Sequence, residues 1–307
     1  MSADCVLPPG ITVFERGWLS SNNILVRDQQ QATLVDSGYC SHAAQTVMLL
    51  EQALGGQALD HLINTHLHSD HCGGNAALQQ RFPRMQTRIP PGQAAHVARW
   101  DPQALSYAAT GQDCPMFGFD ALLTPGQELH LGERLWQVHA APGHDPHAVL
   151  LFEPDAGLLI SGDALWERGF GVVFPELDGL SAFEEVSASL DLIASLHPRT
   201  VIPGHGRVFS QVAQSLAWAR RRLDGFVADP KKHAQYAAKV LLKFKLLELR
   251  QATLASLADW VQGTPCLGQL HERYFDDLPQ SLWLEQLLQD LVRSGAASWR
   301  ADVLCNA

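Results

Sequence analysis

Four side chains able to bind a divalent metal stand within six consecutive positions of the chain. They are His66, His68, Asp70 and His71, in the string T-H-L-H-S-D-H that begins at Thr65. Side chains alternate in an extended segment, so His66 and His68 would point to the same side. Neutral imidazoles and carboxylates are suitable ligands for zinc, iron or manganese. The string therefore predicts a metal site, and a polar surface loop is a poor alternative for so dense a set.

Three further candidates stand alone, each at the end of a predicted apolar strand and each beside a glycine. They are His144 in A-P-G-H, Asp163 in I-S-G-D and His205 in V-I-P-G-H-G. Glycine lets the backbone bend so that such side chains can point into one shared site. Singly, a strand-end histidine is more often a hydrogen-bonded structural residue. Together with the first string, the three predict one site with seven candidate metal ligands.

Short strands and helices must position these residues. Residues 59–64, before the first histidine, form an apolar strand, and residues 75–81 form a helix after a glycine pair. The string thus lies on a strand-to-helix loop, where α/β proteins place their chemistry. Further strands are predicted at 11–15, 23–26, 32–35, 127–130, 135–139, 148–152, 157–161 and 200–203, and helices at 41–54 and 181–196. This order predicts an α/β fold in which two sheets pack face to face with helices outside.

The rest of the chain divides at Ser210. Residues 100–126, which join the two strand-rich halves, are predicted to form a long loop over the site. From Ser210 the apolar residues recur at helical spacing, which sets predicted domain limits of 1–209 for a catalytic domain and 210–307 for a helical one. A helix at 279–294 followed by a β-like piece at 297–303 is compatible with a winged-helix module. We expect this tail to cover one side of the site or to make a homodimer contact, and to supply no metal ligand.

Composition narrows the function classes. The chain has 307 residues, 46% of them hydrophobic, and a net charge of -10. The charge is -12 up to Arg207 and +2 beyond it, and an acidic catalytic part makes nucleic acid an unlikely partner, although a basic run at 231–245 keeps that alternative open. Six scattered cysteines, no apolar run of about 18 residues and no signal-like start predict a cytoplasmic protein with no membrane contact.

The string from Thr65 to His71, followed by the separate His144, Asp163 and His205, resembles the metal-binding pattern of the metallo-β-lactamase superfamily in its two-metal form, as in glyoxalase II. The resemblance covers about residues 11–208. It implies the four-layer αββα sandwich of that superfamily. The tail resembles, much less specifically, the winged-helix-like extension carried by one branch of it.

The resemblance also implies roles for the seven residues. It assigns one set of three ligands to each ion, His66, His68 and His144 to the first, and Asp70, His71 and His205 to the second. Asp163 would bridge two divalent ions, zinc by preference, with iron or manganese as alternatives. Such ions lower the pKa of a bound water towards about 7. Asp70 is the predicted catalytic residue, since a carboxylate ligand can also orient that water and pass on its proton.

Some residues depart from the pattern or keep two interpretations. His147 stands where the superfamily often has a small residue, and a surface or structural role is favoured over a functional one. Cys72 adjoins a candidate ligand, and a small buried thiol is the favoured interpretation. The aromatic side chains between Trp166 and Phe174, with Phe170 among them, would line a substrate pocket or pack the tail. We find no match to the basic glutathione-binding cluster of glyoxalase II.

These observations favour a metal-dependent hydrolase of a small-molecule ester, thioester or lactone. A secreted β-lactamase is disfavoured because an export signal is missing and because Asp163 stands where such enzymes usually lack a bridging carboxylate. A metal-dependent phosphodiesterase or nuclease is the alternative enzyme. A redox enzyme is disfavoured because His68 stands where flavodiiron proteins have glutamate. The alternative that is not an enzyme is a metal-loaded ligand-binding or regulatory protein.

Overall fold

The computed structural model describes residues 6–307, which divide into two compact units. The first unit contains the residues up to Leu105 together with Cys114–Leu223, and the second contains Ser106–Asp113 and Asp224–Ala307. The limit after Leu223 falls inside helix α8 (Val212–Ala228). The sequence-based domain limits of 1–209 and 210–307 stay a prediction.

The first unit contains a six-stranded mixed sheet. Its strands follow chain order, β1 (Ile11–Phe14), β2 (Asn23–Arg27), β3 (Ala32–Val35), β4 (His61–Ile63), β5 (Gln86–Ile89) and β6 (Ala121–Leu122). The pairs β1–β2 and β2–β3 are antiparallel, while β3 through β6 pair in parallel. Parallel pairing brings the carboxyl ends of β3 and β4 to the same edge of the sheet, and both ends lead into site residues.

A five-stranded sheet completes this unit. Its strands lie in the order β11 (Thr200–Pro203), β10 (Leu158–Gly162), β9 (Val149–Glu153), β8 (Arg134–Ala140) and β7 (Glu128–Leu131). The pair β10–β11 is parallel and the other neighbours are antiparallel. Because β10 and β11 run the same way, the residues that follow them emerge at one edge.

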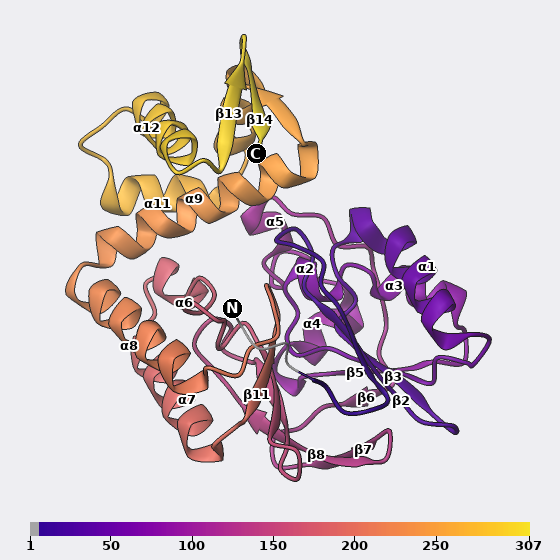
Figure 1. Ribbon diagram of the computed structural model, residues 1–307. Helices are drawn as coiled ribbons and strands as arrows, with labels where there is room; N and C mark the ends of the chain where they lie inside the picture. Colours follow the sequence, from indigo (N-terminus) through magenta and orange to yellow (C-terminus); the bar gives the residue numbers. More distant parts are fainter. Residues whose placement is uncertain (1–5) are drawn as a thin grey trace. The chain divides into compact units, whose positions relative to one another are not determined.

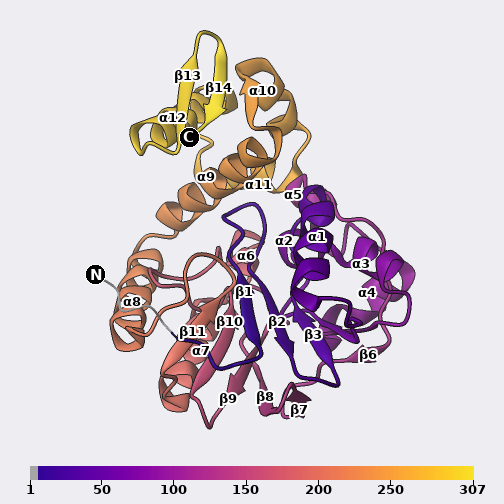
Figure 2. The ribbon, with the colours of Figure 1, turned by 45° about the vertical axis from the view of Figure 1, so that its right-hand side comes forward.

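The two sheets enclose the main core and helices cover their outer faces. On β2, Ile24 and Val26 belong to the core cluster that also contains Trp136 and Ile160 of the second sheet, whereas Leu25 belongs to a cluster with residues of α1 and α3. The covering helices are α1 (Ala43–Leu54), α3 (Asn75–Arg81) and α7 (Phe183–Leu196). Figures 1 and 2 show α1 and α3 beside the first sheet and α7 along the second. The predicted sandwich of two sheets with helices outside is confirmed.

Short helices connect the longer elements, and two of them occupy segments in which the sequence suggested loops. Ser69–Cys72 form the one-turn helix α2 inside the histidine string, and Tyr107–Thr110 form α5 inside the predicted loop at 100–126. The others are η1 (Cys40–His42), η2 (Pro91–Gln93), α4 (Ala94–Arg99) and α6 (Phe174–Leu177). Helix α1 ends where predicted, since Gly55 adopts the left-handed conformation (φ 58°) that favours glycine.

The second unit is built on the 20-residue helix α9 (Pro230–Leu249). It continues with β12 (Gln251–Thr253), α10 (Leu254–Gln262), α11 (Pro265–Tyr274), α12 (Gln280–Arg293), β13 (Ala297–Arg300) and β14 (Val303–Asn306). The three strands form a sheet in the order β12-β14-β13, and α5 packs against α11. Sequence analysis missed the strands β12 and β14. The winged-helix assignment of this unit stays a prediction.

The basic run of the second unit is largely engaged within the unit. Lys239 pairs with Asp290, Lys245 pairs with Glu248, and Lys243 donates to the Ala296 carbonyl oxygen. Lysines paired in this way present less free positive charge to a polyanion. No helix among residues 6–307 has both the length and the apolar character needed to cross a bilayer.

Candidate metal centre

Three imidazoles, those of His66, His68 and His144, form one set of candidate ligands, which we call the first group. One nitrogen from each ring lies within 4.8 Å of the others. His66 and His68 belong to the segment that leaves β4, while His144 follows the end of β8. The Nδ1 of His68 lies 2.8 Å from the Nε2 of His144. Two strands from different sheets thus bring three nitrogen donors to one point.

The second group contains Asp70, His71, Asp163 and His205, whose ligand atoms also lie within 4.8 Å of one another. Helix α2 supplies Asp70 and His71, while β10 and β11 end just before Asp163 and His205. The Nε2 of His205 lies 3.0 Å from the Oδ2 of Asp70. All seven residues that sequence analysis singled out therefore gather in two adjacent groups of the first unit.

Four of the imidazoles, those of His66, His71, His144 and His205, use Nδ1 for contacts with residues outside the two groups. Two of these contacts are with backbone carbonyl oxygens. His144 donates from Nδ1 to the Val172 carbonyl oxygen at 2.5 Å, and His205 donates to the Gly17 carbonyl oxygen at 3.2 Å. Carbonyl oxygens only accept hydrogen bonds, so each of these rings carries a proton on Nδ1 and directs Nε2 toward the candidate ligand groups. Histidine ligands to metals have this arrangement, in which the second nitrogen donates to a fixed acceptor.

Two buried nitrogens support a fit between these residues and a metal. Among the residues that the structure describes, the Nε2 atoms of His66 and His71 have no hydrogen-bond partner. Both rings are almost completely buried, at 1% and 0% exposure. A buried polar atom without a partner is destabilising by roughly 1 to 3 kcal/mol, so such atoms usually mark a ligand or ion position. The donor set of imidazoles and carboxylates fits divalent transition metals.

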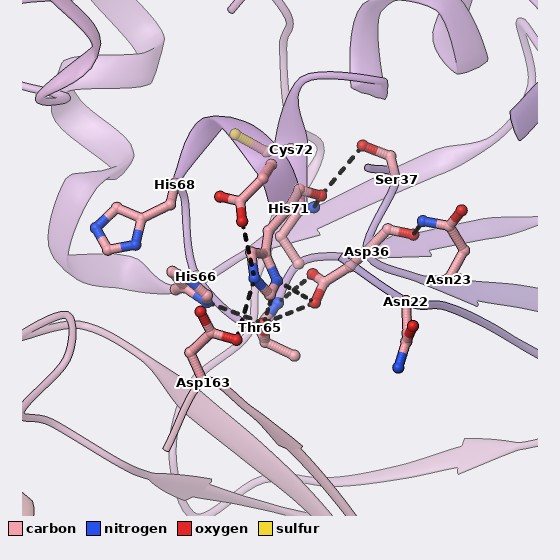
Figure 3. A network of polar contacts seen from close by, with 12 residues as sticks. Asn22, Asn23, Asp36, Ser37, Thr65, His66, His68, His71, Cys72 and Asp163 are labelled. Atoms are coloured by element: carbon pink, nitrogen blue, oxygen red, sulfur yellow. Dashed lines mark hydrogen bonds and ion pairs between the residues drawn. The ribbon is translucent and has the colours of Figure 1, made fainter. Parts of the chain in front are cut away.

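Asp36 is a functional residue that sequence analysis missed. It follows β3, is buried, and accepts from the Nδ1 of His71 at 2.8 Å. Its carboxylate also accepts from the backbone N–H and the hydroxyl of Thr65, both at 2.8 Å. In Figure 3, dashed lines join the Asp36 carboxylate to both Thr65 and His71. The signal was an aspartate after an apolar strand, which is weak alone because the link to His71 depends on the pairing of β3 with β4.

Thr65 extends this network to the first group. Its hydroxyl donates to Asp36, so its oxygen is left to accept from the Nδ1 of His66 at 3.1 Å. One buried carboxylate therefore orients His71 directly and His66 through a hydroxyl. Asp36 keeps this position with a positive φ of 58°, a conformation that aspartate tolerates better than most residues.

The loop after β1 ties the two edges of the site together. The Ser21 N–H donates to the Asp70 carbonyl oxygen at 2.9 Å, and the Asn22 N–H donates to the Gly204 carbonyl oxygen at 2.6 Å. The Asn22 side-chain amide also donates to the carbonyl oxygens of Pro203 at 3.0 Å and Gly206 at 2.8 Å. The backbone on both sides of His205 is therefore held in place relative to the segment that carries Asp70.

Asp163 lies between the two groups. Its Oδ2 is 3.4 Å from the Nε2 of His144 and 3.8 Å from the Nε2 of His205, one residue from each group. Its Oδ1 is 3.4 Å from the Nε2 of His71. Gly204 is required beside it, because a Cβ there would overlap this carboxylate. The geometry is compatible with a carboxylate that contacts two ions at once.

The groups differ in their electrostatics. Burial lowers the pKa of His66 well below its ordinary value, with neighbouring imidazoles adding to the effect, and burial lowers the pKa of His144 to about 4. Burial acts in the same sense on His71, but the carboxylates of Asp36, Asp163 and Asp70 outweigh it and raise the pKa of His71 well above its ordinary value. The pKa of His205 is also raised, since Asp163 and Asp70 outweigh burial there.

Aromatic rings flank the metal-binding groups. Trp18, which is 54% exposed, stacks on His205 with ring centroids 5.4 Å apart. Trp166 meets both rings edge-on, and its Nε1 donates to the Oδ1 of Asp163 at 3.1 Å. Phe174 lies edge-on to His68, with centroids 4.8 Å apart. Sequence analysis had left the segment 166–174 open, and two of its aromatic residues contact candidate ligands or their rings.

The other two open residues have ordinary surroundings. Cys72 is fully buried, its thiol contacts the Leu67 carbonyl oxygen, and its Sγ lies 3.8 Å from the Sγ of Cys114. The side chain of His147 packs against Gly92, and its backbone N–H donates to Asp145 at 2.7 Å. Neither residue belongs to the two metal-binding groups.

Comparison with known proteins gives consistent matches. The model of the family described as the Metallo-beta-lactamase superfamily matches residues 16–205, more than half of the chain. A hydroxyacylglutathione hydrolase from Rhodobacter capsulatus is 34% identical over 148 residues, which are 48% of this chain and 48% of that relative. The chain thus matches about half the length of this curated relative.

Solved structures resemble the fold. A beta-lactamase domain protein from Burkholderia ambifaria superposes with a TM-score of 0.60 at 20% identity, covering 100% of this chain and 97% of that one. The protein TTHA1623, solved in a di-iron-bound form, superposes with a TM-score of 0.55 at 25% identity, covering 68% of this chain and 98% of that one.

Proposed function

The chain belongs to the metallo-β-lactamase superfamily, and from this premise we propose that it is a dinuclear metal-dependent hydrolase of a small ester, thioester or lactone. The observation that carries the proposal is the geometry of the seven side chains. Two groups of ligand atoms lie side by side, and Asp163 has oxygens facing both. Unpaired Nε2 atoms in both groups support metal binding in each.

In this proposal each residue has a distinct task. The first group would hold one divalent ion, Asp70, His71 and His205 would hold the second, and Asp163 would be shared by both. When bound, the ions supply an acidified water near neutral pH and polarise the carbonyl oxygen of the substrate. Zinc is the expected metal, with iron and manganese as alternatives.

Asp70 is the proposed catalytic residue. Its side chain is 14% exposed, whereas that of Asp163 is only 5% exposed, so a water approaching from solvent meets Asp70 first. His71 and His205 lower the pKa of Asp70 against the opposing effect of burial, which keeps the carboxylate ionised and able to accept a hydrogen bond. Asp70 can therefore accept a hydrogen bond from the attacking water and orient it, and we propose that it also passes the proton of that water to the leaving group.

The substrate class follows from the surroundings of the site. The relatives named hydroxyacylglutathione hydrolases favour a thioester among the three acyl substrates. The sequence has no match to the basic glutathione-binding cluster, so we expect a thiol portion other than glutathione. Trp18 and Phe174 lie next to candidate ligands of different groups and offer apolar surface to an acyl chain.

Cell location and partners follow by the same reasoning. The six cysteines are scattered along the sequence with no dense disulfide framework, which supports a reducing compartment, and we propose a cytoplasmic enzyme. Its partner is a small-molecule substrate, and the tail contributes to a homodimer or to substrate range. Nucleic acid is not an expected partner, because the first unit is acidic and the lysines of the second are paired internally.

A hydrolysis screen tests the proposal. Esters, thioesters, lactones and phosphodiesters are offered to the protein loaded with zinc, manganese or iron in turn. We expect turnover of an acyl substrate that a chelator abolishes and added metal restores. Turnover of phosphodiesters alone would favour the nuclease alternative. Tight ligand binding by the loaded protein, with no turnover of any class, would favour a regulatory or ligand-binding protein.

A further inference from the structure

The indole of Trp166 contacts Asp163 without being a candidate metal ligand itself. Its Nε1 donates to the Oδ1 of Asp163 at 3.1 Å. Indole nitrogen is a donor only, so this contact has one direction and requires an unprotonated oxygen.

The two oxygens of Asp163 have different surroundings. Oδ1 is enclosed by the Trp166 indole, by His71 and by the backbone of Gly204, which leaves no room for a Cβ. Oδ2 faces His144 of the first group and His205 of the second. Oδ1 is thus the anchored oxygen, and Oδ2 is the one directed toward ligand atoms of both groups.

The indole is itself held in place by its turn. The Trp166 N–H donates to the Gly169 carbonyl oxygen at 2.7 Å, which closes the turn, and Gly169 has a φ of 124° that a side chain would strain. The guanidinium of Arg168 lies over the ring of Trp218, 5.3 Å from its centroid. A turn fixed in this way presents the indole N–H in one direction.

Ring contacts fix the plane of the indole. Trp166 meets Trp18 edge-on at 5.2 Å with an interplanar angle of 72°, and meets His205 at 5.6 Å with an angle of 80°. Trp18 and His205 are stacked at an angle of 8°. Rotation of the indole away from Asp163 would break both edge contacts, so these rings favour the orientation that donates to Oδ1.

We propose that Trp166 is a positioning residue that anchors Asp163 through Oδ1 and so directs Oδ2 toward both metal-binding groups. This inference rests on the proposed dinuclear function. Without the indole N–H, the carboxylate can rotate about its Cβ–Cγ bond and contact one group alone. Contacts of this kind to a ligand typically change metal affinity or activity by about 10- to 100-fold when removed.

The test is Trp166→Phe, which removes the donor and keeps an aromatic ring. The matched control is Trp218→Phe, the same substitution on the ring that contacts the same turn through Arg168. Zinc affinity is measured by competition with a chelator, and kcat and KM are measured on the substrate found by the screen. We expect Trp166→Phe to weaken the second ion by about 10- to 100-fold and to lower kcat by a similar factor, with KM within about twofold.

A third variant separates the hydrogen bond from packing. Trp166→Gln keeps a side-chain N–H donor without adding an imidazole ligand and should recover most of the zinc affinity that Trp166→Phe loses. If Trp166→Phe does not fold, the comparison of Trp166→Gln with the unaltered protein decides, since a marked loss of the second ion in that folded variant would overturn the inference. The inference is also overturned if Trp166→Phe takes up two ions with unchanged affinity and kcat.

Failure of the proposed function has a different signature. In that case the unaltered protein itself saturates below two zinc ions per chain, whatever residue stands at position 166. Failure of the inference alone leaves the unaltered protein with two ions and shows no difference between the Trp166→Phe and Trp218→Phe variants.

Discussion

The first group consists of imidazoles alone, whereas the second combines two imidazoles with two carboxylates and has Asp36 behind it. Their charges differ accordingly. Burial lowers the pKa of His66 and His144, so these rings are neutral near pH 7, while carboxylates outweigh burial and raise the pKa of His71 and His205. The first group is therefore ready to bind a cation, and the second must release protons to do so.

This difference suggests how the site stays stable before metal binds. Protonated imidazoles balance the carboxylates of the second group, so its negative charges are not left buried and unpaired. The neutral imidazoles of His66 and His144 in the first group need no such balance. The expected order of loading is first group before second, and the variants below test whether the two groups can be separated experimentally.

The largest effect is expected at Asp163, which contacts ligands of both groups. Asp163→Asn keeps the shape of the side chain but removes its negative charge. We expect metal content to fall from about two ions per chain to about one, and turnover to fall on the order of 10³-fold, because both ions lose an anionic ligand. Elemental analysis and rate measurement on the same sample check this. Retention of two ions with normal turnover would show that the groups do not depend on a shared carboxylate.

A smaller effect is expected at Asp70, which belongs to the second group alone. Asp70→Asn should keep much of its metal and lose rate by about 10²-fold or more, because its carboxylate handles a proton in the transition state. Metal content and turnover are measured across about pH 6 to 9, a range that includes the pKa expected for an acidified water. Full metal together with near-normal turnover across that range would leave Asp70 with no role beyond ligation.

Asp36 offers a way to perturb the second group from outside it. Asp36→Asn removes the carboxylate that accepts from His71 and should weaken the second ion by about 10- to 100-fold, with a smaller loss at the first ion because Asp36 reaches His66 only through the Thr65 hydroxyl. Asp145→Asn is the matched variant on the other side, since Asp145 lies 3.7 Å from His68 of the first group. Zinc titrations should show that the zinc affinity of the second group falls most in Asp36→Asn and that of the first group falls most in Asp145→Asn. Equal losses at both sites in each variant would mean that the groups bind as one unit.

The pH dependence should be the mildest of these differences. The raised pKa values of His71 and His205 mean that their protons compete with the second ion, so its affinity should fall as the pH falls, by up to about 10-fold per pH unit for each proton displaced. His66 and His144, with lowered pKa values, should leave the first ion nearly insensitive between about pH 7 and 8. Calorimetric titration in buffers of different ionisation enthalpy measures proton release at each site. Release of equal numbers of protons on binding of each ion would contradict the proposed difference between the two groups.

Sequence alone predicted the parts of this molecule that depend on local pattern. The sandwich of two sheets was predicted from apolar strands, and the seven residues of both groups were predicted from a dense string and three strand-end positions. Asp36 was missed because its partner, His71, lies 35 positions away and is reached only through the pairing of β3 with β4. The assignment of Ser106–Asp113 to the second unit was missed for the same reason, since it depends on contacts between residues distant in sequence.

Trp166 shows a further limit of sequence patterns. The composition of residues 166–174 indicated aromatic packing or a substrate pocket, and both interpretations depend on rings as apolar surface. The structure adds a polar contact from the indole N–H to Asp163. No periodicity or spacing could indicate which atom of the ring would be used.

The central claim is that two adjacent groups hold two ions and that hydrolysis requires both. The most direct measurement is a titration of the metal-free protein with zinc in which bound metal per chain and turnover of the acyl substrate are followed together. We predict a first ion that binds with little or no turnover, and turnover that rises with the second ion to saturation at about two per chain. Saturation at one ion, or full turnover once a single ion is bound, would contradict the account.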